Sequence, residues 1–112
     1  MGKFKSTERK GFHITFENGL TVSVQWGAGN YCDNHFYCDF SHTKDMESNT
    51  AEVAVWSNER WLNANDFTGE EVCDSCDDVV GYLTPEQVVD LLVKVRECPV
   101  EKINNLRKAI CM

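Results

Sequence analysis

The sequence predicts an α+β fold in which an antiparallel sheet of three to five strands is packed by a C-terminal helix, with a short final helix after it. Two segments, 12–16 and 20–26, alternate apolar and polar residues with a period of two, which is typical of half-buried strands. A helix-start signal at Thr84 is followed by apolar residues at helical spacing. Because the strands precede the helix, we expect the helix to cover one face of the sheet.

The turn between the first two strands can be tested against their pattern. A two-residue Asn-Gly loop would pair Phe16 with Thr21 and place the two apolar rows on opposite faces. A three-residue loop pairs Phe16 with Leu20 and places all apolar residues on one face. It also needs a left-handed residue at its end, where Gly19 falls. The sequence therefore predicts a three-residue loop with a bulge.

Three further strands are expected from apolar and β-branched runs: Ala51–Trp56, a short strand at Trp61–Ala64, and Val79–Leu83. The polar stretch between Gly27 and Thr50 is long for a loop in a small domain, which indicates a functional, a pinned or a partly mobile segment.

The main helix begins with Thr84 as its N-cap, Pro85 at its first position and Gln87 completing a capping box. Four residues then share one face, and burying each would contribute roughly 1.5–3 kcal/mol; they are Val88, Leu91, Leu92 and Val95. A shorter helix after Pro99 is expected from Ile103, Leu106 and Ile110. We predict a flexible tail over residues 1–9 and a single domain over residues 10–112.

The chain is acidic, with a formal net charge of −7 over 112 residues. Since nucleic-acid and anionic-membrane binding both rely on Lys and Arg, we expect no direct nucleic-acid partner and no membrane association. Acidity instead favours docking onto a basic surface of a host or rival protein. The alternative is that the acidic residues only keep the protein soluble, and the sequence leaves the oligomeric state open.

The six cysteines indicate reduced thiols or a metal site, because no secretory signal is evident. A Cys-x-x-Cys pair and an earlier cluster could close a tetrahedral zinc site and pin the long loop. The candidate ligands are Cys32, His35, Cys38, Cys73 and Cys76. This spacing is not a standard zinc pattern, so the alternative is free cysteines. Metal analysis of protein purified under reducing conditions would separate the two.

An acidic segment and nearby aromatic residues form a candidate partner-binding surface. The carboxylates are Asp66, Glu70, Glu71, Asp74, Asp77 and Asp78, and the aromatic anchors are Tyr31, Phe36 and Tyr37. The alternatives are a solvated loop for the carboxylates and the core for the aromatic rings.

No set of residues in the sequence has the spacing of a catalytic site, and we predict that the protein is not an enzyme. Cys32 with His35 could be a nucleophile and a base, but nothing in their spacing forces them together. A small enzyme using Cys32 or a carboxylate is therefore the third hypothesis, after a protein-binding protein and a zinc-stabilised structural or interaction module.

Three strings in the chain resemble a family of small uncharacterised proteins carried by bacteriophages and prophages. They are the opening from Gly11 to Cys32, the Ala-Glu-Val-Ala-Val-Trp run of Ala51–Trp56, and the Gly-Tyr-Leu-Thr-Pro-Glu-Gln-Val run of Gly81–Val88. The resemblance implies a cytoplasmic setting in a bacterial host cell and no catalytic motif. Cys38 and the later Cys-x-x-Cys pair look like additions to the family pattern.

The resemblance, the small size and the acidity together predict a phage or mobile-element accessory protein. It would bind and modulate a host protein, and an inhibitor of a defence system such as a CRISPR effector is one case.

Overall fold

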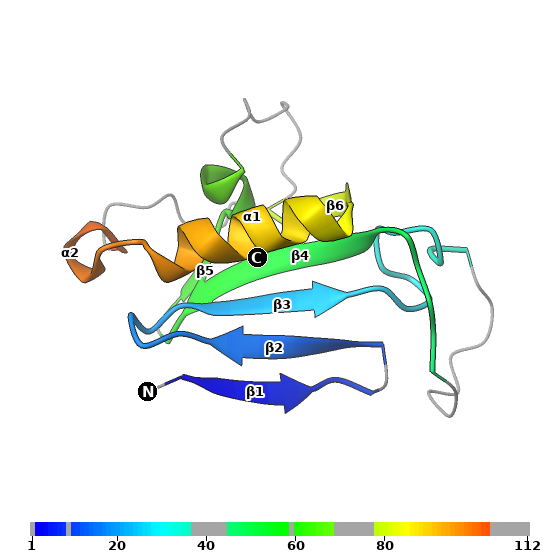
Figure 1. The fold of residues 1–112 in the computed structure, drawn as a ribbon, viewed down its shortest axis with the longest axis horizontal. Coiled ribbons are helices and arrows are strands. Elements are labelled where there is room, and N and C mark those ends of the chain that lie inside the picture. Colours follow the sequence, from blue (N-terminus) through cyan, green and yellow to red (C-terminus); the bar gives the residue numbers. More distant parts are fainter. Residues whose placement is uncertain (1, 9, 37–44, 59, 69–77, 104–112) are drawn as a thin grey trace.

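The computed structural model describes residues 2–8, 10–36, 45–58, 60–68 and 78–103 (Figure 1). Its elements, in chain order, are β1 (Lys3–Ser6), β2 (Gly11–Thr15), β3 (Thr21–Gln25), β4 (Ala51–Ser57), β5 (Arg60–Leu62), the 3₁₀ helix η1 (Ala64–Phe67), β6 (Val80–Leu83), α1 (Pro85–Arg96) and α2 (Val100–Ile103).

The strands form one antiparallel sheet in the order β1-β2-β3-β4-β5, and β6 also pairs with β4. Helix α1 packs against β3, β4 and β6 on one side, and β1 and β2 extend beyond it (Figure 1). The α+β prediction is therefore confirmed, with six strands among the described residues where three to five were expected.

The β2–β3 hairpin has the predicted three-residue connection. Ile14 pairs with Val22, and the Phe16 N–H donates to Leu20 O at 2.9 Å. Gly19 has a φ of +91°, a conformation that favours glycine and closes the turn at the expected position. This register places the apolar rows of both strands on the face covered by α1.

The core lies between that face and α1. Most of its fully buried members come from β3, β4, β5 and α1, and they include Val22, Val53, Val55, Leu62, Leu91 and Val95. Of the predicted helix face, Val88, Leu91 and Val95 are buried, whereas Leu92 is partly exposed. The other face carries no helix in the described part of the chain, and there His13 of β2 packs edge-on against Trp56 of β4 at 4.9 Å.

Both ends of α1 are capped by side chains. At its start, the predicted capping box forms, with the Gln87 N–H donating to Thr84 Oγ1 at 3.2 Å and the Thr84 N–H donating to Gln87 Oε1 at 2.9 Å. At its end, Asn18 of the hairpin turn donates from Nδ2 to the carbonyl oxygens of Val95 at 2.8 Å and Cys98 at 3.1 Å. These two bonds satisfy carbonyl oxygens that have no partner within the helix, and they tie the hairpin to α1.

The N-terminal segment differs from the expected loose tail, because β1 lies within it. Phe4 pairs with Ile14 and Lys5 with His13 in the β1–β2 ladder. A strand of four residues with a single apolar side chain has little hydrophobic pattern, so its pairing depends on the neighbouring strand and not on its own sequence. The predicted strand at Trp61–Ala64 also ends earlier, since Asn63 accepts the Asn65 N–H and starts η1.

Candidate interaction site

The long polar stretch after β3 folds into a compact loop in its first half, residues 27–36. The Gly27 N–H donates to Asn30 Oδ1 at 2.9 Å, the His35 N–H donates to Cys32 O at 2.9 Å, and the Gly29 N–H donates to His35 O at 3.1 Å. Gly29 has a φ of +83°, which lets the chain turn back on itself. The loop therefore supplies many of its own hydrogen bonds.

Two strand residues, Glu52 and Tyr82, fix this loop to the sheet. Glu52 of β4 accepts the Tyr31 N–H at 2.9 Å and the Asn30 side-chain amide at 3.4 Å. Tyr31 O in turn accepts the Tyr82 N–H of β6 at 2.8 Å. Tyr82 has a φ of +56°, which is uncommon for a bulky residue and marks a strained backbone at the residue that makes this bond.

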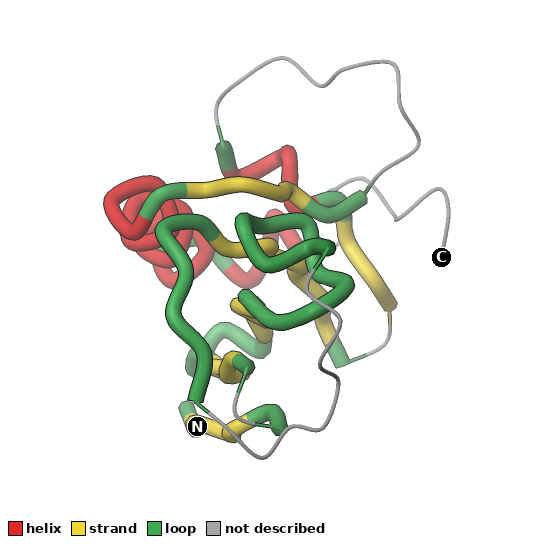
Figure 2. The backbone as a smooth tube through the Cα atoms, turned by 90° about the vertical axis from the view of Figure 1, so that its right-hand side faces the viewer, coloured by secondary structure: helices red, strands yellow, loops and turns green. Residues whose placement is uncertain are grey.

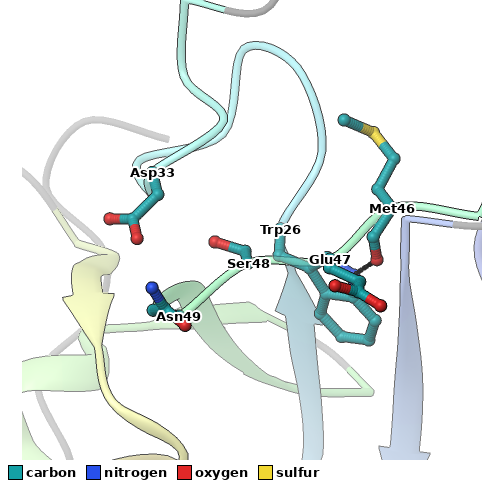
Figure 3. Close-up of a pocket in the computed structure, with 6 residues that line it drawn as sticks. All are labelled: Trp26, Asp33, Met46, Glu47, Ser48 and Asn49. Atoms are coloured by element: carbon teal, nitrogen blue, oxygen red, sulfur yellow. Dashed lines mark hydrogen bonds between the residues drawn. The ribbon is translucent and has the colours of Figure 1, made fainter.

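The second half of the stretch, residues 45–50, is held by side chains. Asn34 donates to Trp26 O at 2.7 Å and to Glu47 O at 2.9 Å, and Trp26 Nε1 donates to Met46 O at 2.8 Å (Figure 3). Thr50 bonds to both the backbone and the carboxylate of Asp33. Both halves therefore meet at the end of the sheet where β3 ends and β4 begins (Figure 2).

A cluster of three rings, here named the loop cluster, lies on the first half. Tyr31 and His35 are stacked at 5.4 Å with an interplanar angle of 18°, and Phe36 meets His35 edge-on at 4.6 Å. Phe36 is 88% exposed and Tyr31 is 43% exposed. Rings held this far into solvent on a bonded loop are the usual anchors of protein interfaces.

Three exposed carboxylates, here named the acidic rim, lie on the same stretch: Asp33, Asp45 and Glu47. Asp33 and Glu47 help to line a hollow of about 640 Å³ between the two halves, with Trp26 and Met46 (Figure 3). Residues 26–36 and 45–50 contain no Lys or Arg. The described part of this region is consequently negative as well as aromatic.

The structure includes two of the five candidate zinc ligands. Cys32 is 1% exposed, and its thiol donates to Gly27 O at 3.7 Å. His35 Nδ1 lies 2.9 Å from Asn30 O. Cys38, Cys73 and Cys76 lie outside the described residues. No group of three or more His, Cys, Asp or Glu side chains within residues 2–8, 10–36, 45–58, 60–68 and 78–103 is arranged to hold a metal. The zinc site stays a prediction.

The predicted acidic segment is described only at its two ends. Asp66 is half-buried in η1, and Asp78 is only 5% exposed, so Asp78 does not belong to an exposed acidic surface as expected. The reason is that Asp78 O accepts the Ala64 N–H at 2.8 Å, which draws the residue in beside η1. Glu70, Glu71, Asp74, Asp77 and Tyr37 lie outside the described residues.

Sequence reasoning singled out Tyr31 and Phe36 as candidate anchors, and both are exposed, but it missed the side chains that hold the loop. Glu52 sits in a strand as an ordinary polar residue, and its bond to the Tyr31 N–H crosses 21 residues of sequence. Asn34 is one of many loop asparagines. The signal in the sequence was the unusual length of the stretch. It indicates that other residues hold the loop in place, but it does not identify them.

Comparison with protein-family models, with curated proteins and with solved structures finds no match to this chain. The fold and site together define an α+β domain that presents an aromatic and acidic loop surface. None of the helices in the described ranges is long and apolar enough to cross a membrane.

Proposed function

We propose that the protein is a non-enzymatic binding protein that docks on a basic surface of another protein through the loop cluster and the acidic rim. The observation that carries this proposal is Phe36, which is 88% exposed yet packs edge-on against the stacked His35 ring. Solvation of an exposed phenylalanine is unfavourable, so a partner that covers it gains apolar burial without first ordering a mobile side chain.

The charge of the rim favours a basic partner. Asp33, Asp45 and Glu47 are exposed on the same stretch as the rings, and the whole chain carries a formal net charge of −7. Opposite potentials accelerate encounter and exclude acidic competitors, whereas the rings supply most of the affinity. Binding should therefore weaken as salt rises, mainly through the association rate.

The contacts of Cys32, the candidate nucleophile, and of His35, the candidate base, also support a binding role. The Cys32 thiol is buried against Gly27 O, and His35 Nδ1 faces Asn30 O while its ring stacks on Tyr31. Both groups thus serve the folding of the loop.

The biological setting in this proposal is that of a phage or mobile-element accessory protein, and the resemblance of three strings to such a family supports it. The partner would then be a bacterial host protein whose activity is modulated, with a defence nuclease as one case, in the cytoplasm of the host cell.

Affinity capture from bacterial lysate tests the proposal, using the wild-type chain and a variant with Asp33→Lys, Asp45→Lys and Glu47→Lys. We expect one stoichiometric protein with a basic surface to be retained by the wild type and released by the variant. A matched control reverses three carboxylates on α1 and α2, Glu86, Asp90 and Glu101, which are exposed and lie outside the loop. Equal retention of that protein by the rim variant and by the control variant would contradict a role for the acidic rim.

A further inference from the structure

The two edges of the sheet differ in how they are covered. On the β6 side, the Tyr82 N–H donates to Tyr31 O, and the β5 residue Arg60 donates to Ile103 O at 2.7 Å. On the other side, β1 is the last strand formed by the described residues (Figure 1). All four of its residues are exposed. An exposed edge strand is a template for pairing with another chain.

The ladder identifies which backbone groups of β1 face outward. The Thr7 N–H donates to Gly11 O at 3.1 Å, in the same register as the β1–β2 pairs. Because hydrogen-bonded and non-hydrogen-bonded pairs alternate in an antiparallel ladder, Lys3 and Lys5 bond to β2. The N–H and C=O groups of Phe4 and Ser6 therefore point away from the sheet.

The side chains of β1 differ between the two faces. Lys3 and Lys5 pair with Thr15 and His13, on the face that α1 does not cover. Phe4 pairs with Ile14 on the α1 side, where it is 79% exposed.

A hollow of about 430 Å³ continues from Phe4 along that side. Ile14 and Phe16 line it together with the charged residues Lys3, Glu17 and Arg96. The edge thus offers cations on one face, an apolar ring with a hollow on the other, and outward-pointing backbone groups between them.

We propose that β1 accepts an extended segment of another protein with alternating acidic and apolar residues, which adds to the sheet as a further strand. Its carboxylates lie opposite Lys3 and Lys5, and its apolar side chains lie on Phe4 and in the adjoining hollow. The backbone groups of Phe4 and Ser6 supply the hydrogen bonds, as in other cases of strand addition.

Charge selects this occupant over a second copy of the chain. Two β1 strands side by side would bring the lysines of one copy against those of the other, and like charges across a strand pair are destabilising. This site is separate from the loop cluster, so either proposal can fail without the other.

A labelled peptide of about eight alternating Glu and Val residues, within the usual length of a strand, is the probe. We expect it to bind the full chain in fluorescence anisotropy. By NMR hydrogen exchange, the amides of Phe4 and Ser6 should exchange at least about tenfold more slowly in the complex. A peptide of the same composition with its Glu and Val residues in separate blocks should not produce this protection.

The variant Lys3→Glu/Lys5→Glu should weaken binding of the peptide by about tenfold or more. A Lys-Val peptide should instead bind that variant. The control Lys94→Glu/Lys102→Glu makes the same change in net charge on α1 and α2, at exposed positions, and should bind as the wild type does.

Ser6→Pro removes an outward N–H without removing a bond to β2, and it should also abolish binding while the circular dichroism spectrum is kept. No binding by the wild type would overturn the proposal, as would equal loss in both lysine double variants. Protection of Phe4 and Ser6 that depends on protein concentration and needs no peptide would assign the edge to a second copy.

Discussion

The helix-covered face of the sheet and the loop at its end are stabilised by different interactions. Beneath α1, residues such as Val53 and Leu91 exclude water and contribute through apolar burial. In the loop, Asn34, Asn30 and Glu52 hold backbone groups through directed hydrogen bonds. Apolar burial has no preferred direction, whereas a hydrogen bond requires a defined geometry. The core therefore sets the global stability, and the loop sets the geometry of the exposed rings.

The largest expected effect belongs to the core. Leu91→Ala should lower the free energy of unfolding by about 2–5 kcal/mol, because it leaves a cavity in the core beneath α1. Urea denaturation followed by tryptophan fluorescence measures this. The exposed α1 substitution Val89→Ala is the matched control, and a comparable loss there would show that α1 is not packed as described.

A smaller but still global effect is expected at the join between the hairpin and α1. Asn18→Ala removes the bonds to the Val95 and Cys98 carbonyls and should cost about 1–3 kcal/mol of unfolding free energy. Because Asn18 lies in a turn, sequence reasoning assigned it only a turn role. An unchanged denaturation midpoint in Asn18→Ala would show that these bonds do not stabilise the protein.

In the loop, the expected effect is local. Asn34→Ala removes the bond to Trp26 O and the bond to Glu47 O, which joins the two halves of the stretch, and it should lower global stability by about 1 kcal/mol or less. Amide exchange in residues 27–36 should accelerate, while exchange in β3 and β4 should stay as in the wild type. Asn58→Ala, in the exposed turn after β4, is the control. Faster exchange throughout the sheet would mean that the loop and core are not distinct units.

The smallest effect concerns pH on the face that α1 leaves uncovered. Burial against Trp56, and secondly the charge of Lys5, lower the pKa of His13 below 6.5. The unfolded chain therefore takes up a proton at His13 before the folded protein does. His13 contributes stability that is present above pH 6.5 and is lost as the pH falls through its folded pKa.

The pH-dependent contribution of His13 to stability should vanish in His13→Gln. Lys5→Gln should raise the pKa of His13 in an NMR titration. A folded pKa at or above 6.5 would contradict the packing of His13 on Trp56.

Apolar periodicity and local turn chemistry were sufficient to predict most of the sheet and α1. The alternation around Gly19 identified the register of the hairpin, and Thr84 with Gln87 identified the helix start. The strand β1 was missed because Phe4 is its only apolar residue, so the signal lies in its partner β2.

The site was predictable only in part. The exposed rings Tyr31 and Phe36 were identified as interface anchors from residue type, whereas Asp78 was assigned to the surface from its charge and is buried. Backbone bonds such as the one between Asp78 and Ala64 depend on how distant segments meet, which residue type does not reveal.

The most direct test of the central claim compares two exposed phenylalanines. Phe36→Ser in the loop cluster and Phe4→Ser on β1 remove the same side chain from positions that are 88% and 79% exposed, and each should change stability by no more than about 0.5 kcal/mol. We predict that Phe36→Ser weakens the affinity for the captured partner by at least about tenfold, while Phe4→Ser leaves it unchanged. Equal affinity of Phe36→Ser and the wild type for that partner would contradict the assignment of the loop cluster as the binding site.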